Sequence, residues 1–337
     1  MHPILLIGGY GSTGRMTAKH LRDLHPDVPL AIAGRNLEAA QSHANELGNA
    51  VAYRVDIAGD EPDMGLPHGN FSAMGIFLMD DTGNATAFAG RHKIPNVAVT
   101  GGAFELGQQV IVGMHAARTS PVIIAGNWYC GGMLWPVLDL CSNFTEIDSV
   151  EVGIVIDRNG GNSGPAVAVD FGRILRSCAT MPQRADKHYH WISAEEGQGT
   201  YIGTGNRLLE GKPAVSCDAI SIGAWTGARN VRVLETWGDS LSFLEKGLPS
   251  DEIAVEVTGK NLDGNPVRLR QEIVAPRQSV TLTSISVALL LEKAAGLGDS
   301  ALAPGLYLSE QALEPRSATQ ALAAAGVQFS EITTTAP

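Results

Sequence analysis

Short apolar runs alternate with longer amphipathic stretches from the N-terminus to Ala125. Such runs, bounded by polar residues or glycine, predict strands buried on both faces. They lie at Ile4–Ile7, Pro29–Ala33, Ala50–Val55, Met74–Met79, Asn96–Thr100 and Pro121–Ala125. The stretches between them predict helices at Ser12–Leu24, Leu37–Leu47, Asn84–His92 and Phe104–Ala117. Strands and helices that alternate in this way predict an α/β fold with a doubly wound parallel sheet, the Rossmann type.

The pattern changes after Trp128. A helix is predicted over Met133–Cys141 and a strand over Ser149–Ile156, before a glycine-rich loop at Asp157–Pro165. Alternating apolar and polar residues then predict further strands at His188–Ser193, Val215–Ile222, Val231–Glu235, Ile253–Val257 and Val267–Ile273. Helical patterns return at Val280–Ala295 and Glu314–Ala325, and a short polar tail follows at Thr333–Pro337. We therefore expect a second, α+β domain with a mostly antiparallel sheet.

Composition favours a globular protein and restricts its partners. Of the 337 residues, 44% are hydrophobic and 18% charged, which is typical of a folded chain long enough for two domains. The 24 basic and 35 acidic residues give a net charge of −11. Because phosphate backbones and anionic lipids repel such a chain, we expect no nucleic-acid partner and no membrane partner.

The cysteines and the apolar segments predict a cytoplasmic location. The four cysteines are widely spaced and form no CxxC pair, which is typical of a reducing compartment. No signal-peptide pattern is found at the N-terminus, and no apolar run approaches the ~20 residues that a membrane span needs.

A glycine-rich motif, Gly9-Tyr10-Gly11-Ser12-Thr13-Gly14, directly follows the first predicted strand and opens the first helix. In the dinucleotide-binding fingerprint the first glycine allows a tight turn, the second lets the pyrophosphate approach the backbone, and the third lets the helix pack closely on the strand. The helix N-terminus would offer N–H groups and a positive dipole end to the phosphates. A purely structural turn is the alternative interpretation.

The end of the second predicted strand indicates which cofactor binds. It reads Ala33-Gly34-Arg35-Asn36, so glycine stands where NAD enzymes carry an acid for the ribose 2′-hydroxyl. The Arg35 guanidinium can instead pair with a 2′-phosphate, and we therefore predict NADP, with Arg35 and Asn36 at the cofactor. A solvated arginine without a specific role is the alternative.

Further cofactor contacts are expected beyond the carboxyl ends of the later strands, where doubly wound sheets bind ligands. Asp80, Thr82, Thr100 and Gly101 follow the fourth and fifth predicted strands. We expect them to flank the ribose and the nicotinamide. Asp56, after the third strand, would lie near the adenine, and a plain strand cap is an equally good interpretation.

At this point the chain resembles the saccharopine dehydrogenase-like oxidoreductases. The resemblance rests on Ile4–Arg15, Ala33–Asn36, Ile124–Gly126, Pro304–Glu310 and the later Gly326-Val-Gln. It implies a Rossmann domain at 1–128, an inserted substrate and dimerisation domain at 129–279, and a C-terminal segment at 280–337 that returns to the first. It also implies a homodimer and hydride transfer between a nicotinamide cofactor and a C–N bond. The lysine–histidine pair of the saccharopine-oxidising branch cannot be placed here, so no catalytic residue is carried over.

Catalytic candidates therefore come from the residues alone. Tyr129 follows the sixth strand and could donate the proton that imine reduction needs, or could simply pack at the domain junction. His190 shares a strand face with His188 and could relay protons, or could lie on a solvated face. Arg277 could hold a substrate carboxylate, or could be a solvated loop residue. No third ligand accompanies the two histidines, so we predict no metal.

The leading hypothesis is an NADPH-dependent oxidoreductase acting on the C–N bond of a small amino-acid-like substrate. A carbonyl or enoyl reductase on the same scaffold is the alternative enzyme. A non-catalytic NADP-sensing protein is the alternative from another class.

Overall fold

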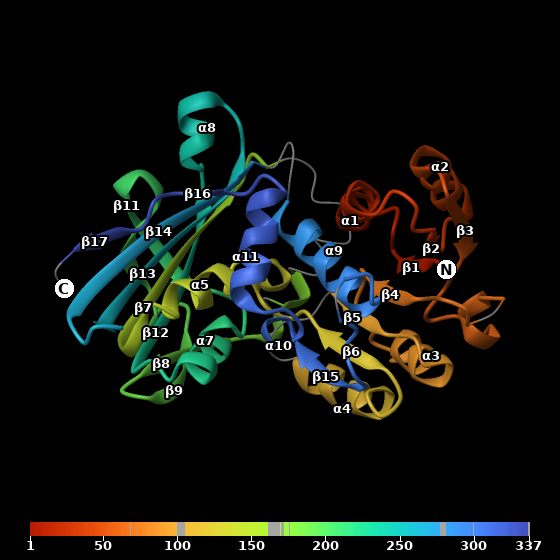
Figure 1. Ribbon diagram of the computed structural model, residues 1–337, viewed down its shortest axis with the longest axis horizontal. Helices are drawn as coiled ribbons and strands as arrows, with labels where there is room; N and C mark the ends of the chain where they lie inside the picture. The colour runs from red at the N-terminus through yellow and green to blue at the C-terminus, as the bar shows by residue number, and fades with distance from the viewer. Residues whose placement is uncertain are drawn as a thin grey trace. The chain divides into compact units, whose positions relative to one another are not determined.

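The computed structural model describes residues 1–67, 69–99, 105–160, 169, 172–174, 176–276, 281–298 and 300–335. The chain divides into two compact units. Unit 1 comprises Met1–Gly126, Ser163–Arg173 and Thr283–Leu313, and unit 2 comprises Asn127–Asn162, Ile174–Leu282 and Glu314–Pro337. Each unit has its own sheet (Figure 1). Within the described ranges, no helix is long and apolar enough to cross a membrane.

Unit 1 contains a parallel sheet in the order β15-β6-β5-β4-β1-β2-β3. Its strands are β1 (Ile4–Ile7), β2 (Leu30–Gly34), β3 (Ala50–Arg54), β4 (Ala73–Ile76), β5 (Asn96–Ala98), β6 (Pro121–Ile124) and β15 (Gly305–Leu308). Its helices include α1 (Ser12–Leu24), α2 (Leu37–Leu47), α3 (Asn84–His92), α4 (Leu106–Ala116), α9 (Leu282–Ala294) and α10 (Ser309–Ala312), with a 3-10 turn, η1 (Pro62–Gly65). The predicted Rossmann fold class is confirmed.

The strand order of unit 1 reverses between β1 and β4, and this reversal places the helices. Crossovers between parallel strands are right-handed, so α1 and α2 cover one face of the sheet while α3 and α4 cover the other. Strands β1, β2 and β4 are buried along their whole length because both faces are covered. Such a reversal creates the crevice at which doubly wound sheets bind ligands.

Unit 2 contains a mixed sheet in the order β10-β11-β12-β7-β13-β14-β16. Its strands are β7 (Phe144–Asp157), β8 (Thr180–Ala185), β9 (His188–Ser193), β10 (Gly199–Ile202), β11 (Leu208–Pro213), β12 (Asn230–Gly238), β13 (Ser250–Asn261), β14 (Pro266–Pro276), β16 (Gln328–Phe329) and β17 (Thr333–Thr335). Its helices include α5 (Leu134–Cys141), α7 (Asp218–Thr226), α8 (Leu241–Lys246) and α11 (Pro315–Ala324), with the 3-10 turns η2 (Trp128–Gly131) and η3 (Thr204–Asn206). Among the described strands of unit 2, β7 and β12 alone pair in parallel, so the prediction of a mostly antiparallel sheet is confirmed.

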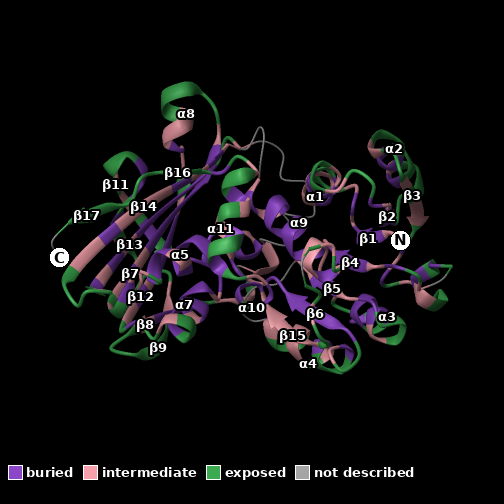
Figure 2. Ribbon diagram, in the orientation of Figure 1, coloured by how far each residue is buried: buried purple, intermediate pink, exposed green. Residues whose placement is uncertain are grey.

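The burial pattern separates core from surface in each unit (Figure 2). In unit 2, the buried residues of β7 include Val150, Val152 and Ile154, and Trp135 of α5 is fully buried. Helix α8, by contrast, has no buried residue.

Two predictions about unit 2 are wrong. Val215–Ile222 was expected to be a strand, but residues from Asp218 form helix α7, which buries Ala219, Ile222 and Gly223 on one face and ends at Gly227 with a φ of +68°. The apolar residues of Val215–Ile222 fit both the two-residue period of a strand and the roughly 3.6-residue period of a helix, and packing in the folded unit favours the helix. The expected polar tail includes β17, which pairs with β14.

One guanidinium holds together the sheet edge of unit 1. Arg22, in the last turn of α1, donates from Nη1 to the carbonyl oxygens of Pro26 (2.6 Å) and Val28 (2.7 Å). Its Nη2 donates to the carbonyls of Gly48 (2.9 Å) and Asn49 (3.2 Å). The planar fork thus fixes the loops that precede β2 and β3, a geometry that one ammonium group cannot reproduce.

We expect Arg22→Ala and Arg22→Lys both to destabilise the protein, because each leaves carbonyl groups of two loops without their donor. A hydrogen bond to a charged group is worth about 1.5–3 kcal/mol, and we expect a loss in the free energy of unfolding of at least that size for Arg22→Ala. Urea unfolding followed by circular dichroism measures it. Lys19→Ala on the same helix is the control, since its exposed ion pair with Asp23 is worth well under about 1 kcal/mol. Equal losses for the two alanine variants would contradict the interpretation.

Candidate dinucleotide-binding site

The glycine-rich loop turns tightly at the end of β1. Gly8 adopts a φ of +84° and donates its N–H to the carbonyl of Ala33 (2.8 Å), which joins the loop to β2. The N–H of Gly9 donates to Leu6 (3.1 Å) and that of Gly11 to Gly8 (2.9 Å). These bonds bring the chain from the end of β1 directly into the first turn of α1.

The three motif glycines meet different neighbours. A Cβ at Gly9 would lie 2.8 Å from both the Cβ and the carbonyl oxygen of Leu6. A Cβ at Gly14 would lie 2.6 Å from the Gly8 oxygen and 2.7 Å from the Gly9 Cα. At Gly11, by contrast, a Cβ would meet only the Gly8 oxygen, at 3.2 Å. Contacts within the chain therefore require glycine at positions 9 and 14. At position 11 the chain leaves nearly enough room for a Cβ, so glycine there is better explained by the close approach of a ligand.

The N-terminus of α1 has no side-chain cap among the described residues. Its N-cap residue is Gly11, and its first turn contains no acidic residue. Helix α2, by contrast, is capped by Asn36, whose Oδ1 accepts from the Ala39 N–H (3.0 Å). The first N–H groups of α1 and its positive dipole end are thus left for an anion, and the exposed Ser12 hydroxyl stands beside them. The loop and helix fit the pyrophosphate of a dinucleotide.

Tyr10 links this loop to the end of β2. Its ring lies against Gly34, where a Cβ would be 2.5 Å from Cε1, and its hydroxyl accepts the N–H of Asn36 (3.1 Å). Arg35, between these two residues, is exposed, and its side chain has no ion pair or hydrogen bond within the part of the chain that the structure describes. A guanidinium in this state is available to a ligand.

The other predicted cofactor residues have structural partners. Asp56 accepts the N–H of Ala58 (3.2 Å), which corresponds to the strand-cap interpretation. Asp80 caps the first turn of α3 by accepting from the N–H (2.9 Å) and the hydroxyl (3.0 Å) of Thr86. Thr82 donates to the carbonyl of Ile57 (3.2 Å). These contacts shape the loops around the sheet reversal, and Thr100 and Gly101 lie outside the described residues.

Tyr129 lies in a strained turn of unit 2. Tyr129 and the buried Cys130 have φ angles of +54° and +55°, a region that non-glycine residues rarely adopt. The turn is fixed to α7, because the carboxylate of Asp218 accepts the Trp128 N–H (2.8 Å). The Tyr129 hydroxyl lies 3.4 Å from a carboxylate oxygen of Asp251, a residue only 2% exposed.

Sequence reasoning missed Asp218 and Asp251. Asp218 was placed inside a predicted strand, and the predicted strand at Ile253–Val257 began two residues after Asp251. An acidic residue beside an apolar run was the one available signal, and it does not distinguish a buried carboxylate from a solvated one.

No hydrogen bond or ion pair between described residues joins His190 to Tyr129. His190 is exposed on β9, opposite Gln183 of β8, as on the solvated strand face that was the alternative interpretation. Arg277 lies outside the described residues.

With this geometry known, the chain can be compared with other proteins. No protein-family model matches it, and no curated protein does. Among solved structures, saccharopine dehydrogenase (L-Glu forming) from Saccharomyces cerevisiae has a TM-score of 0.70 at 11% identity, and the match covers 100% of both chains. The chain has the fold of saccharopine dehydrogenase.

Two other structures are less similar. Dihydrodipicolinate reductase from Paenisporosarcina sp. TG-14 has a TM-score of 0.45 at 12% identity, covering 92% of this chain and 98% of that one. Biliverdin reductase from Synechocystis sp. PCC 6803 has a TM-score of 0.43 at 9% identity, covering 95% and 96%. The match to saccharopine dehydrogenase, with its TM-score of 0.70, confirms the resemblance expected from the sequence at the level of the fold.

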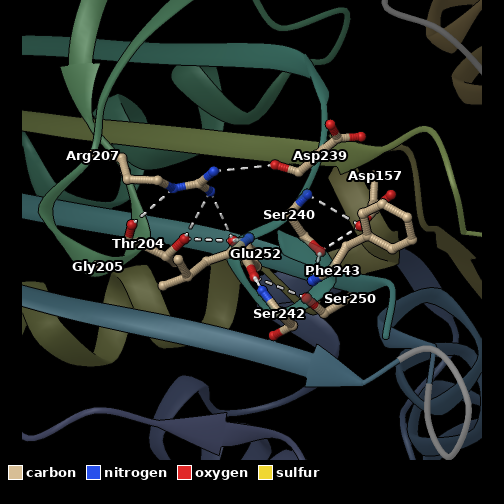
Figure 3. Close-up of polar contacts among 12 residues, drawn as sticks. Asp157, Thr204, Gly205, Arg207, Asp239, Ser240, Ser242, Phe243, Ser250 and Glu252 are labelled. Atoms are coloured by element: carbon tan, nitrogen blue, oxygen red, sulfur yellow. Dashed lines mark hydrogen bonds and ion pairs between the residues drawn. The ribbon is translucent and has the colours of Figure 1, made fainter. Parts of the chain in front are cut away.

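Unit 2 of this saccharopine dehydrogenase-like fold also contains a buried polar cluster around Glu252 (Figure 3). The Glu252 carboxylate accepts from the backbone N–H groups of Leu241 (2.9 Å) and Ser242 (3.0 Å), from the Ser250 hydroxyl (2.9 Å), and from Thr204 and Arg207. The chain's own donors thus occupy both carboxylate oxygens.

Asp157 supports the same region of unit 2. It accepts from the backbone N–H (3.1 Å) and the hydroxyl of Ser240, the residue that caps α8 (Figure 3). Burial alone would raise the pKa of Asp157, but hydrogen bonds from Ser240 and Asn159 lower it. We interpret the Glu252 cluster as the support of α8 and η3 and not as a ligand site.

The two glycines of the loop that differ in their surroundings make a paired test. We expect Gly14→Ala to destabilise the protein by about 1–3 kcal/mol, because its Cβ overlaps the backbone of Gly8 and Gly9. Gly11→Ala should unfold close to the wild-type denaturant concentration but bind a dinucleotide about tenfold or more weakly, since the methyl group keeps the pyrophosphate from the amides. Urea unfolding and calorimetric titration measure the two effects. Unchanged affinity in Gly11→Ala would show that the loop is only a structural turn.

Proposed function

We propose that this protein is an NADPH-dependent oxidoreductase that transfers hydride to or from the C–N bond of a small amino-acid-like substrate. Among the described residues, the N-terminus of α1 behind Gly11 has no side-chain cap and no acid in its first turn, and the Arg35 guanidinium has no partner; this combination carries the proposal. The likeness in fold to a saccharopine dehydrogenase that forms L-Glu supports the choice of a C–N bond.

The residues of unit 1 would hold the two charged parts of the cofactor. The backbone N–H groups at the start of α1 would bind the pyrophosphate, and Arg35 would bind the 2′-phosphate with a bidentate, charge-assisted pair. When bound, the nicotinamide supplies the hydride. The protein's own task is to orient the cofactor and to supply a proton.

Tyr129 is the proposed source of that proton. Its hydroxyl donates to the buried carboxylate of Asp251 (3.4 Å), and its turn is fixed by Asp218, so the group is held in one place. A held phenol can give a proton to a nitrogen as the adjacent carbon receives hydride. Arg277 stays a predicted partner of the substrate carboxylate, and His190 a predicted relay.

A substrate panel tests the reaction class. NADPH consumption with 2-keto acids should appear only when an amine is also present, because the imine forms from the two. Turnover of ketones or enones without amine would favour the carbonyl or enoyl reductase. Tight NADPH binding without turnover on any panel would favour the NADP-sensing protein.

Arg35→Ala should weaken NADPH by about tenfold to a hundredfold and leave NADH nearly unchanged, because NADH lacks the 2′-phosphate. Calorimetric titration of both cofactors gives the ratio. Arg91→Ala is a matched control, since Arg91 is another exposed arginine of unit 1 but is paired with Asp63 (2.7 Å). Equal weakening of NADPH and NADH would remove the phosphate-binding role.

Tyr129→Phe should lower turnover by about 100-fold or more, the usual contribution of a positioned proton donor, with little change in NADPH affinity. Single-turnover oxidation of NADPH with the best substrate of the panel measures the chemical step. Tyr189→Phe is a control that removes another hydrogen-bonded tyrosine hydroxyl of the same unit, one that donates to the Ile220 carbonyl (3.1 Å) and accepts from Arg184 (2.9 Å). Unchanged turnover in Tyr129→Phe would exclude Tyr129 as the acid.

A further inference from the structure

The space at the end of β2 is filled by a side chain from the glycine-rich loop. Gly34 is buried, and a Cβ there would lie 2.5 Å from Cε1, 2.8 Å from the hydroxyl oxygen and 2.9 Å from Cζ of Tyr10. Real Cβ contacts are not this short. The Tyr10 ring thus lies where any side chain of residue 34 would begin.

Tyr10 has little freedom to leave this place. Its neighbour Gly9 is packed against Leu6, and the N–H of Gly11 is bonded to Gly8 (2.9 Å). Its hydroxyl accepts the N–H of Asn36 (3.1 Å), the residue whose side chain caps α2. The backbone of Tyr10 is therefore fixed by the loop, and its hydroxyl is bonded to the β2–α2 turn.

This position matters because residue 34 decides between the two cofactors. An acid at the end of the second strand binds both ribose hydroxyls of NAD and repels a 2′-phosphate. Here the ring fills the space that the Cβ of an acid would need, while the same turn leaves the Arg35 side chain exposed and unpaired among the described residues.

We propose that Tyr10 is a specificity-determining residue, which excludes an acid from position 34 and holds the turn in which Arg35 meets the 2′-phosphate. The proposal rests on the proposed function and deepens it. Tyr10 acts through the shape of the turn and not through charge.

The experiment is a double-mutant cycle of Tyr10→Ala and Gly34→Asp, read by thermal unfolding and by titration with NADPH and NADH. Gly34→Asp alone should lower the Tm by several degrees and weaken both cofactors, because the new side chain overlaps the ring. The double variant should recover most of that Tm loss and shift the NADH/NADPH affinity ratio toward NADH by about tenfold or more relative to wild type.

A second background separates the ring from the hydroxyl. Tyr10→Phe keeps the ring, so Gly34→Asp should be as damaging in Tyr10→Phe as in wild type. If Gly34→Asp is tolerated in wild type, or if Tyr10→Ala fails to rescue it, the proposal is wrong.

The outcomes also distinguish this proposal from the proposed function. Wild-type protein that binds neither NADPH nor NADH would refute both. Wild-type protein that prefers NADPH but shows no coupling between the two positions would refute only the role of Tyr10.

Discussion

The contact on which the candidate site depends is the approach of α1 to the end of β1. Gly14 lies so close to Gly8 and Gly9 that no Cβ fits between them, and the first turn of α1 therefore begins directly at the sheet edge. The consequence is electrostatic as well as steric. The unbonded N–H groups and the positive dipole end come to the carboxyl end of the strands, where the sheet order reverses. An ordinary side chain at position 14 would push the helix away and remove the anion site with it.

The fold of unit 1 could be predicted from the sequence because its signals are local. Helices at Ser12–Leu24, Leu37–Leu47 and Asn84–His92 have the predicted bounds, since each follows a buried strand and begins and ends at clear polar or glycine positions. Unit 2 was harder to predict because its strands pair over long distances in the sequence. The spacing of apolar residues in Val215–Ile222 is compatible with a strand or a helix, and packing against distant segments favours the helix.

The site shows a similar division. The glycine motif and Arg35 could be predicted because each belongs to a short segment of consecutive residues that directly follows a predicted strand. The sequence could not show which polar residues near strand ends cap helices and which are left to bind a ligand. Asn36 and Asp80 cap helices in the structure, although their positions in the sequence are equally compatible with ligand contacts. The contact of Tyr10 with Gly34 joins residues of two different strand–helix connections, and only the parallel register of β1 and β2 brings them together.

The net charge of −11 is the strongest objection to an anionic ligand, and magnitudes answer it. At physiological salt the Debye length is about 8 Å, so acidic groups spread over the surface contribute little at a site beyond that distance. A guanidinium about 4 Å from a phosphate gains about 4 kcal/mol at the effective dielectric constant of a protein surface. Local donors therefore outweigh the overall field, provided that no acid stands among them. The first turn of α1 contains none, and Tyr10 keeps one from arising at position 34. In an acidic chain, the exclusion of a carboxylate is as much a part of phosphate recognition as the arginine is.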